Sequence, residues 1–192
     1  MARLVRYTVS HVRFVASDAV LFLEGKLKGV VLRDAVVADI AAILEVQYDA
    51  VRSYDPRFAD LDDARERMLK WLSGFRQKWR RIRVMLVEDR IVGVSDVEYL
   101  GPPLETYAYL VGVYVDPTVH GRGFGRALCE DQLTWLRERG ASEIRCHVDP
   151  INVHAQWLLV QHGFSRDDRP AASEAEFVLS GGGAFLRYVL TL

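Results

Sequence analysis

The chain has 192 residues, half of them hydrophobic, which suits one domain with a substantial core and excludes a largely disordered protein. Its 25 basic and 26 acidic residues give a formal net charge of −1, which argues against a nucleic-acid partner and against a polybasic membrane binder. Cys129 and Cys146 are too few for a disulfide framework, and no stretch reaches the ~18 apolar residues of a membrane span. The sequence therefore predicts a cytoplasmic protein that binds neither nucleic acid nor membrane.

The first part of the chain predicts strands that alternate with helices. Residues 1–29 contain period-two patches that fit a hairpin or a short helix, and we expect this N-terminal extension to pack on the main domain, residues 30–192. Within that domain the pattern predicts a strand over 30–33, a helix over 37–46, a loop over 48–60 and a second amphipathic helix over 61–79.

Five basic residues follow one another closely at the end of the second expected helix: Arg76, Lys78, Arg80, Arg81 and Arg83. Such a cluster fits a solvated helix C-terminus, where cations complement the helix dipole. It also fits a patch for a phosphate or an acidic substrate, and the sequence leaves both interpretations open.

The second part of the chain predicts the rest of a mixed sheet with flanking helices. The expected elements are a hairpin over 84–87 and 91–99, a strand over 107–115, a helix over 123–139, a strand over 143–148, a helix over 150–163 and a strand pair over 176–179 and 185–190. This alternation predicts an α/β fold. The last strand could supply an edge for a homodimer.

A glycine-rich turn joins the strand that ends at Val115 to the helix that follows. Gly121, Gly123 and Gly125 let the backbone approach a ligand closely, and the first N–H groups of the helix have no intrahelical acceptor. Arg122 and Arg126 add positive charge. We therefore expect an anion-binding loop here.

Other phosphate-binding motifs fit this loop less well. A nucleotide P-loop ends in Gly-Lys-Ser/Thr, whereas Arg126 and Ala127 follow Gly125 here. A dinucleotide-binding fingerprint needs a third glycine at position 126, which Arg126 occupies. A tight turn without a ligand stays open as a further alternative.

Two motifs together resemble the GNAT superfamily of N-acetyltransferases. The first is its pyrophosphate loop, Gln/Arg-x-x-Gly-x-Gly/Ala after a strand: Gly123 and Gly125 occupy the two small positions, and His120 stands where the family usually has Gln or Arg. The second is its Asn-x-x-Ala-x-x-Leu-Tyr-x-x-x-Gly-Phe helix, matched by Asn152, Ala155, Leu158, Gly163 and Phe164. The resemblance covers residues 113–164 and implies a mostly antiparallel central sheet flanked by helices.

The resemblance also implies acetyl-CoA as co-substrate. By analogy, a backbone N–H near residues 113–115 would polarise the thioester carbonyl, and the asparagine of the second motif would contact the pantetheine arm. The expected cofactor-binding residues are Val113, Tyr114, Val115, His120, Gly121, Arg122, Gly123, Phe124, Gly125, Arg126, Asn152 and Ala155. We expect no metal, because the histidines lack the spacing of metal ligands.

The resemblance implies direct attack of an amine on the thioester, which needs a proton acceptor. Glu98 is the first candidate base, although it also fits a solvent-facing carboxylate. Tyr109 falls near the position where the family's central strand often carries an acid. Leu159 replaces the tyrosine that commonly serves as general acid, so Tyr109 or Tyr114 could donate instead, or the loss could be tolerated.

For the acceptor, the primary amine of a small molecule or of a protein, the expected binding residues are Tyr54, Glu98 and His147. A Cys146–His147 dyad is not expected, because adjacent residues of a strand point to opposite faces. His147 also fits a surface histidine.

Two further functions stay open beside the N-acetyltransferase. Leu159 and the missing strand acid fit a non-catalytic domain that binds acyl-CoA, and the glycine-rich loop leaves a nicotinamide-binding protein as the third alternative.

Overall fold

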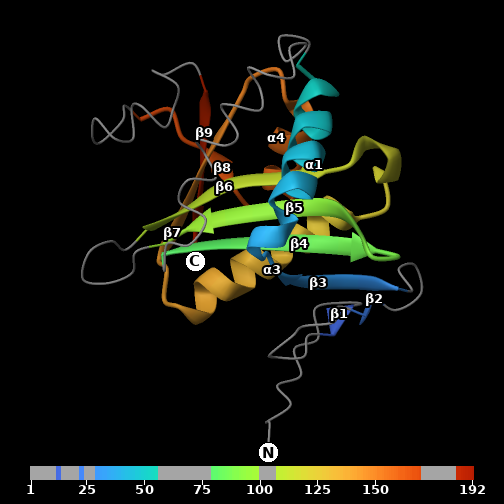
Figure 1. Cartoon of the computed structure of the whole chain (residues 1–192). Coiled ribbons are helices and arrows are strands. Elements are labelled where there is room, and N and C mark those ends of the chain that lie inside the picture. The colour runs from blue at the N-terminus through green and yellow to red at the C-terminus, as the bar shows by residue number, and fades with distance from the viewer. Residues whose placement is uncertain (1–11, 14–21, 24–28, 56–78, 100–106, 170–184) are drawn as a thin grey trace, which may run out of the picture.

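The computed structural model describes residues 12–13, 22–23, 29–55, 79–99, 107–169 and 185–192, and a mixed sheet forms its centre (Figure 1). Within these residues the sheet has seven strands in the order β3-β4-β5-β6-β7-β9-β8. Their bounds are β3 Val30–Asp34, β4 Arg80–Val87, β5 Arg90–Glu98, β6 Tyr107–Val115, β7 Glu143–Val148, β8 Ser165–Arg166 and β9 Leu186–Thr191. Of the pairs described, β6–β7 is parallel and the others are antiparallel. The predicted fold class is confirmed.

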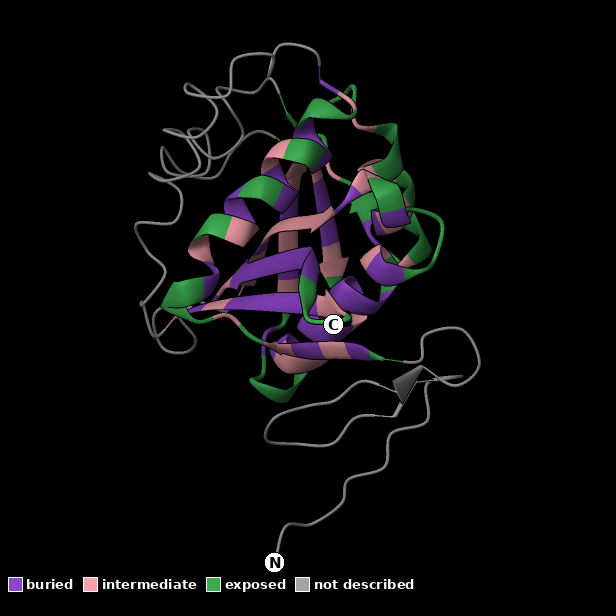
Figure 2. Cartoon of the chain, turned by 45° about the vertical axis from the view of Figure 1, so that its right-hand side comes forward, coloured by how far each residue is buried: buried purple, intermediate pink, exposed green. Residues whose placement is uncertain are grey.

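Helices cover both faces of this sheet (Figure 1). The short 3-10 helix η1, Val37–Asp39, leads into α1, Ile40–Arg52, which packs on one face. On the other face lie α3, Phe124–Glu138, and α4, Val153–Gln161, and a second 3-10 helix, η3, Pro117–Val119, precedes α3. Figure 2 shows the buried residues concentrated in the sheet between these helices. The two faces of the sheet therefore have separate cores.

Two expectations for the first part of the chain were wrong. The first helix continues to Arg52 instead of giving way to a loop at residue 48, because no glycine or proline interrupts it and Ala50 and Val51 extend its buried face. The strand β4 begins at Arg80, so Arg80, Arg81 and Arg83 belong to a strand and not to a helix end. The second expected helix, over 61–79, lies outside the described residues up to Lys78.

The hairpin of β4 and β5 is confirmed, and Glu88 and Asp89 at its turn both have positive φ angles, as a tight two-residue hairpin turn requires. The last strand, β9, was expected to form an edge of the sheet, but β8 pairs with Tyr188 and Val189 of β9 and is the edge strand instead. The predicted strand over 176–179 lies outside the described residues.

Near the N-terminus, β1, Val12–Arg13, pairs with β2, Phe22–Leu23, as a hairpin. The division of the chain into an extension and a main domain stays a prediction.

Candidate active site

The strands β6 and β7 separate along their length. They pair over three residue pairs, from Tyr107↔Glu143 to Tyr109↔Arg145, and within the described residues no further pair joins them. Beyond this point β6 continues to Val115 and β7 to Val148. Beyond this point the backbone N–H and C=O groups on the facing sides of β6 and β7 are not used in the strand ladder. They can therefore form hydrogen bonds with a ligand inserted between the two strands.

A β-bulge in β6 lies just beyond the last of these pairs. Asp96 pairs with Gly112 and Val97 with Leu110, so Val111 is the extra residue. The bulge shifts the alternation of side chains along β6. Leu110 before it and Val113 after it both pack in the core beside α3 and α4, whereas Tyr114 packs against the core beside α1.

The glycine-rich loop leads from the end of β6 to the N-terminus of α3. Gly121 and Gly123 have φ angles of +75° and +85°, which favour glycine, and a Cβ atom at either position would meet nothing within 4 Å. The N–H of Ala127 donates to the Gly123 carbonyl at 3.0 Å, so the N–H groups of residues 124–126 precede the first hydrogen bond of the helix. The loop is therefore open to an anion at a helix N-terminus.

Asp116 holds the start of this loop. Its carboxylate accepts hydrogen bonds from the Thr118 N–H at 2.8 Å, from the Thr118 hydroxyl at 2.6 Å and from Arg90 at 2.6 Å. Desolvation raises the pKa of Asp116, but the hydrogen bonds from Thr118 and Arg90 outweigh it and keep this pKa below its usual value. Asp116 therefore fixes the loop at the end that follows β6.

The side chains expected in the cofactor site are not equally available for contact with a ligand. The exposed His120 ring bonds to the Val115 carbonyl, with 2.9 Å between Nε2 and O, so it also supports the loop. Phe124 is buried in the core and offers a ligand only its backbone. Arg126 is exposed beside Glu130 at 3.0 Å, and the Arg122 guanidinium lies over the Phe124 ring.

The second motif meets the first at α4. A Cβ atom at Gly125 would lie 3.7 Å from Val115 and 3.9 Å from Leu158, so β6, α3 and α4 converge at this glycine. Asn152 is the N-cap of α4, and its side-chain oxygen accepts the Ala155 N–H at 3.0 Å. Leu159 is buried in the core, so neither its chemistry nor its position supplies a proton donor.

Polar and aromatic side chains gather on the α1 face of the sheet, next to the point where β6 and β7 separate. Glu98 pairs directly with Tyr109 across β5 and β6. The Tyr109 ring is stacked on His147 of β7, with 6.1 Å between ring centroids, and meets Tyr107 edge to face at 5.5 Å. The Arg145 guanidinium lies 3.9 Å from the centroid of the Tyr107 ring. Three residues expected from the sequence, Glu98, Tyr109 and His147, are therefore brought together.

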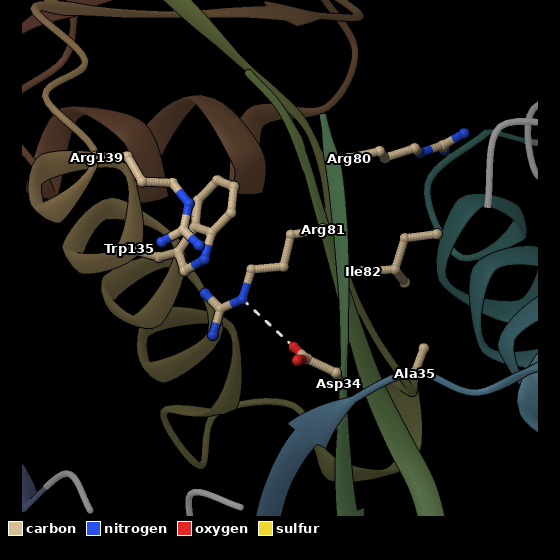
Figure 3. Close-up of a pocket in the computed structure, with 7 residues that line it drawn as sticks. All are labelled: Asp34, Ala35, Arg80, Arg81, Ile82, Trp135 and Arg139. Atoms are coloured by element: carbon tan, nitrogen blue, oxygen red, sulfur yellow. Dashed lines mark hydrogen bonds and ion pairs between the residues drawn. The ribbon is translucent and has the colours of Figure 1, made fainter. Parts of the chain in front are cut away.

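Arg80 also belongs to this group, which the spacing of the basic residues did not predict. Its Nε lies 3.1 Å from both carboxylate oxygens of Asp96 and 3.7 Å from Glu98 Oε1. Figure 3 shows Arg80 and Arg81 leaving β4 on opposite sides, Arg81 toward Asp34 and Trp135. Alternation along β4, read together with the acidic partners on β5, was the available signal.

The buried Asp96 differs from the partly exposed Glu98 two residues away. The Asp96 side chain is 0% exposed and that of Glu98 28%. Burial raises the pKa of Asp96, and the hydrogen bonds from Arg80 oppose this rise and favour the ionised carboxylate. The two carboxylates and one guanidinium form a compact charged group on the α1 face.

Tyr114 lies on this same face, close to Asp96 and Tyr54. The Tyr114 ring lies over Gly112, where an added Cβ atom would overlap it, and it packs against the same core as Tyr54. Burial raises the pKa of Tyr114, to which Tyr54 and Asp96 add. Tyr114 therefore keeps its proton at neutral pH and is a poorer acid than an exposed tyrosine.

The two cysteines take no part in this chemistry. Cys146 is buried in the core beside α4, on the opposite side of β7 from His147, as alternation predicts. Burial raises the pKa of Cys146 to about 12 and also raises that of Cys129, so both stay thiols.

Neither a metal site nor a membrane-spanning helix is found in the part of the chain that the structure describes. The described residues contain no group of three or more histidine, cysteine or acidic residues placed to hold a metal ion. No helix among them combines the length and the apolar character needed to cross a membrane.

Comparison with known sequences links the chain to a family of enzymes. The model of the acetyltransferase (GNAT) family matches residues 43–164. A mycothiol acetyltransferase of Beutenbergia cavernae is 38% identical over 69 residues, which cover 36% of this chain and 21% of that protein. One of Catenulispora acidiphila is 32% identical over 109 residues, 55% of this chain and 33% of that protein. The chain thus spans a third or less of the length of these relatives.

Comparison with solved structures concerns the fold. The PaiA N-acetyltransferase from Thermoplasma acidophilum, solved in complex with coenzyme A, superposes with a TM-score of 0.68 at 12% identity, over 86% of this chain and 100% of that one. At this identity the likeness extends to the arrangement of the elements, including the sheet described above.

Proposed function

The chain belongs to the acetyltransferase (GNAT) family, and we propose that it is an acetyl-CoA-dependent N-acetyltransferase that acts on a primary amine. The observation that carries the proposal is that β6 separates from β7 beyond Tyr109 and then leads, after Val115, into the open loop of Gly121 and Gly123. A strand gap provides backbone groups for an extended ligand, and a helix N-terminus provides N–H groups for its pyrophosphate. Acetyl-CoA bound there would supply an activated acetyl thioester.

The residues present fit the anionic part of such a co-substrate. The open positions of Gly121 and Gly123 leave room for a pyrophosphate, and the N–H groups of residues 124–126 would donate to it. Arg122 and Arg126 would add charge at the rim. Backbone groups of β6 and β7 beyond their last pair would hold the extended arm, and an N–H of residues 113–115 would stabilise charge on the acetyl oxygen.

The acceptor amine would meet the α1 face of the sheet at Glu98 and Tyr109. An amine arrives as an ammonium ion, which a carboxylate and an aromatic ring both attract. Glu98, which is partly exposed, would accept its proton, and Tyr109 and His147 would form the wall against which it is oriented. The amine would then attack directly in a complex that holds both reactants, which lowers the barrier by orientation.

A second candidate function is acyl-CoA binding without transfer. It is favoured by Leu159, which is buried where the resemblance implies a tyrosine, so that position offers no proton for a departing thiolate. Transfer without this donor stays chemically reasonable, because a thiol with an ordinary pKa of about 8.5 is a fair leaving group near neutral pH.

Thiol release from acetyl-CoA across a panel of small amines and peptides tests the proposal, with coenzyme A binding measured by calorimetry on the same preparation. Saturable binding together with thiol release that depends on one class of amine supports N-acetyl transfer. Tight binding without release across the whole panel contradicts transfer and supports the binding function. Saturable NAD(H) binding without competition from coenzyme A would contradict both.

A further inference from the structure

The ion pair between Arg80 and Asp96 is buried on the same side of the sheet as Glu98. The Arg80 side chain is 3% exposed, and it holds both oxygens of Asp96 with Nε. Its Nε is also 3.7 Å from Glu98 Oε1, so one guanidinium contacts two carboxylates from neighbouring positions of β5. Arg80 and Glu98 are themselves directly opposite in the β4–β5 register.

Packing alone gives little reason for this pair. The same face of β4 and β5 carries Ile82, Val84 and Val94, all buried in the core beside α1. Burying two charges costs desolvation free energy, and apolar residues of similar volume often stabilise a protein as well or better. Stability alone therefore does not account for the ion pair, and Glu98 is the partly exposed group that it contacts.

We propose that Arg80, held in place by Asp96, is a positioning residue for Glu98: it directs the Glu98 carboxylate toward the acceptor, while Asp96 offsets its charge so that Glu98 can still take up a proton. The inference rests on the proposed role of Glu98 as the base. A lone arginine at this distance would keep the carboxylate charged and make it a weaker base, whereas the paired one anchors it at smaller electrostatic cost.

The charged and titratable groups around Glu98 come from several strands. Arg80 faces it from β4, Asp96 lies on its own strand, and Tyr109 faces it from β6. On β7, His147 is stacked on the Tyr109 ring, and Arg145 lies over the Tyr107 ring. A change confined to Arg80 or Asp96 leaves the groups of β6 and β7 in place, so their contribution is constant across the variants.

The test is the pH dependence of kcat/KM in variants that remove each charge. In Asp96→Asn the uncompensated Arg80 keeps Glu98 ionised, so the acidic limb of the kcat/KM profile, where activity falls as Glu98 is protonated, should move to lower pH by about 1 unit or more. In Arg80→Met the acidic limb should move to higher pH. In the double variant it should return close to its wild-type position. A purely structural ion pair would alter thermal stability without these opposite shifts.

A control pair lies on the opposite side of β4. Arg83 contacts Asp131 with 3.1 Å between Nε and Oδ2, and this pair is also buried, but it faces α3. The double variant Arg83→Met/Asp131→Asn should lower thermal stability and leave the acidic limb where it is. A shift of the limb in this control would overturn the assignment to Arg80.

A second measurement follows the Glu98 carboxyl directly by NMR titration in the wild type and in Asp96→Asn. Ionisation of Glu98 at lower pH in the variant supports the proposal, and identical titration curves overturn it. If Glu98→Gln keeps the acidic limb, the role of Glu98 as base fails and this inference with it. If Glu98→Gln abolishes the limb but Asp96→Asn does not move it, only the inference about Arg80 fails.

Discussion

Glu98 and Tyr109 lie directly opposite each other on β5 and β6, and the Tyr109 ring stacks on His147 of the neighbouring strand β7. The carboxylate, the phenol and the imidazole thus form one row over three strands. This row ends where β6 and β7 stop pairing. A group between the two strands and an amine on the α1 face would meet at this point.

Glu98→Gln is expected to lower kcat by about 10²- to 10⁴-fold, the usual range for loss of a general base, while coenzyme A affinity stays unchanged. The amide keeps the shape of the side chain but cannot accept the proton of an ammonium ion. Rates and calorimetric affinities measured on the same protein separate the two effects. Glu138→Gln, at an exposed position near the end of α3, is the control and should match the wild type. An unchanged pH–rate profile in Glu98→Gln would remove Glu98 from the mechanism.

Tyr109→Phe separates the hydroxyl of Tyr109 from its ring. The ring keeps its stacking on His147, so the KM for the amine should change little. If the hydroxyl donates a proton or a hydrogen bond to the reacting atoms, kcat should fall by about 10-fold or more. Tyr107→Phe is the matched control, since Tyr107 meets the same ring edge to face. Equal kcat values for the two variants would restrict Tyr109 to an orienting role.

Gly123→Glu tests the anion-binding loop. The added carboxylate should repel a pyrophosphate and lower coenzyme A affinity by at least about 10-fold. Gly140→Glu is a close control, because Gly140 has a φ angle of +77° with nothing within 4 Å of an added Cβ, but lies beyond the other end of α3. Both variants should lose about 1–2 kcal/mol of stability from the left-handed backbone. Equal affinity in calorimetry for both would contradict the loop assignment.

Local pattern was sufficient to predict most of the sheet and the glycine-rich loop. Strand alternation gave β5, β6 and β7, and Gly121 and Gly123 do adopt the left-handed conformation that only glycine takes readily. The pairing of Glu98 with Tyr109 was not predictable, because it depends on the β5–β6 register and on the extra residue at Val111.

Charge clusters were the weakest signal in the sequence. Arg80 and Arg81 are neighbours in the chain, yet they lie on opposite faces of β4 and contact different acids, Asp96 and Asp131. Those acids are 16 and 50 positions away, so tertiary pairing and not local spacing decides what each arginine does. A strand assignment for residues 80–83 would have separated the two faces.

Asp39→Asn tests a contribution to stability that depends on pH. Hydrogen bonds from Arg33 at 2.6 and 2.9 Å and from the Val36 N–H at 2.8 Å hold the pKa of Asp39 below its usual value. A lowered folded-state pKa stabilises the protein above the ordinary aspartate pKa of about 3.9, and this contribution is lost as the pH falls below it. Urea unfolding should show the variant less stable than the wild type at pH 7, with a smaller difference near pH 3. A difference that grows on acidification would contradict this.

Gly112→Ala tests how the bulge of β6 is packed. An added Cβ atom would overlap the ring of Tyr114, whose Cζ and hydroxyl oxygen lie 2.7 Å from its position, so the ring must shift within the core beside α1. Overpacking of this kind costs about 1–3 kcal/mol. In a Tyr114→Ala background the same change should cost much less, because the obstructing ring is gone. The interaction free energy from the double-mutant cycle, measured by denaturant unfolding, should therefore favour the double variant over the sum of the single ones. Additive effects would show that the ring and Gly112 are not in contact.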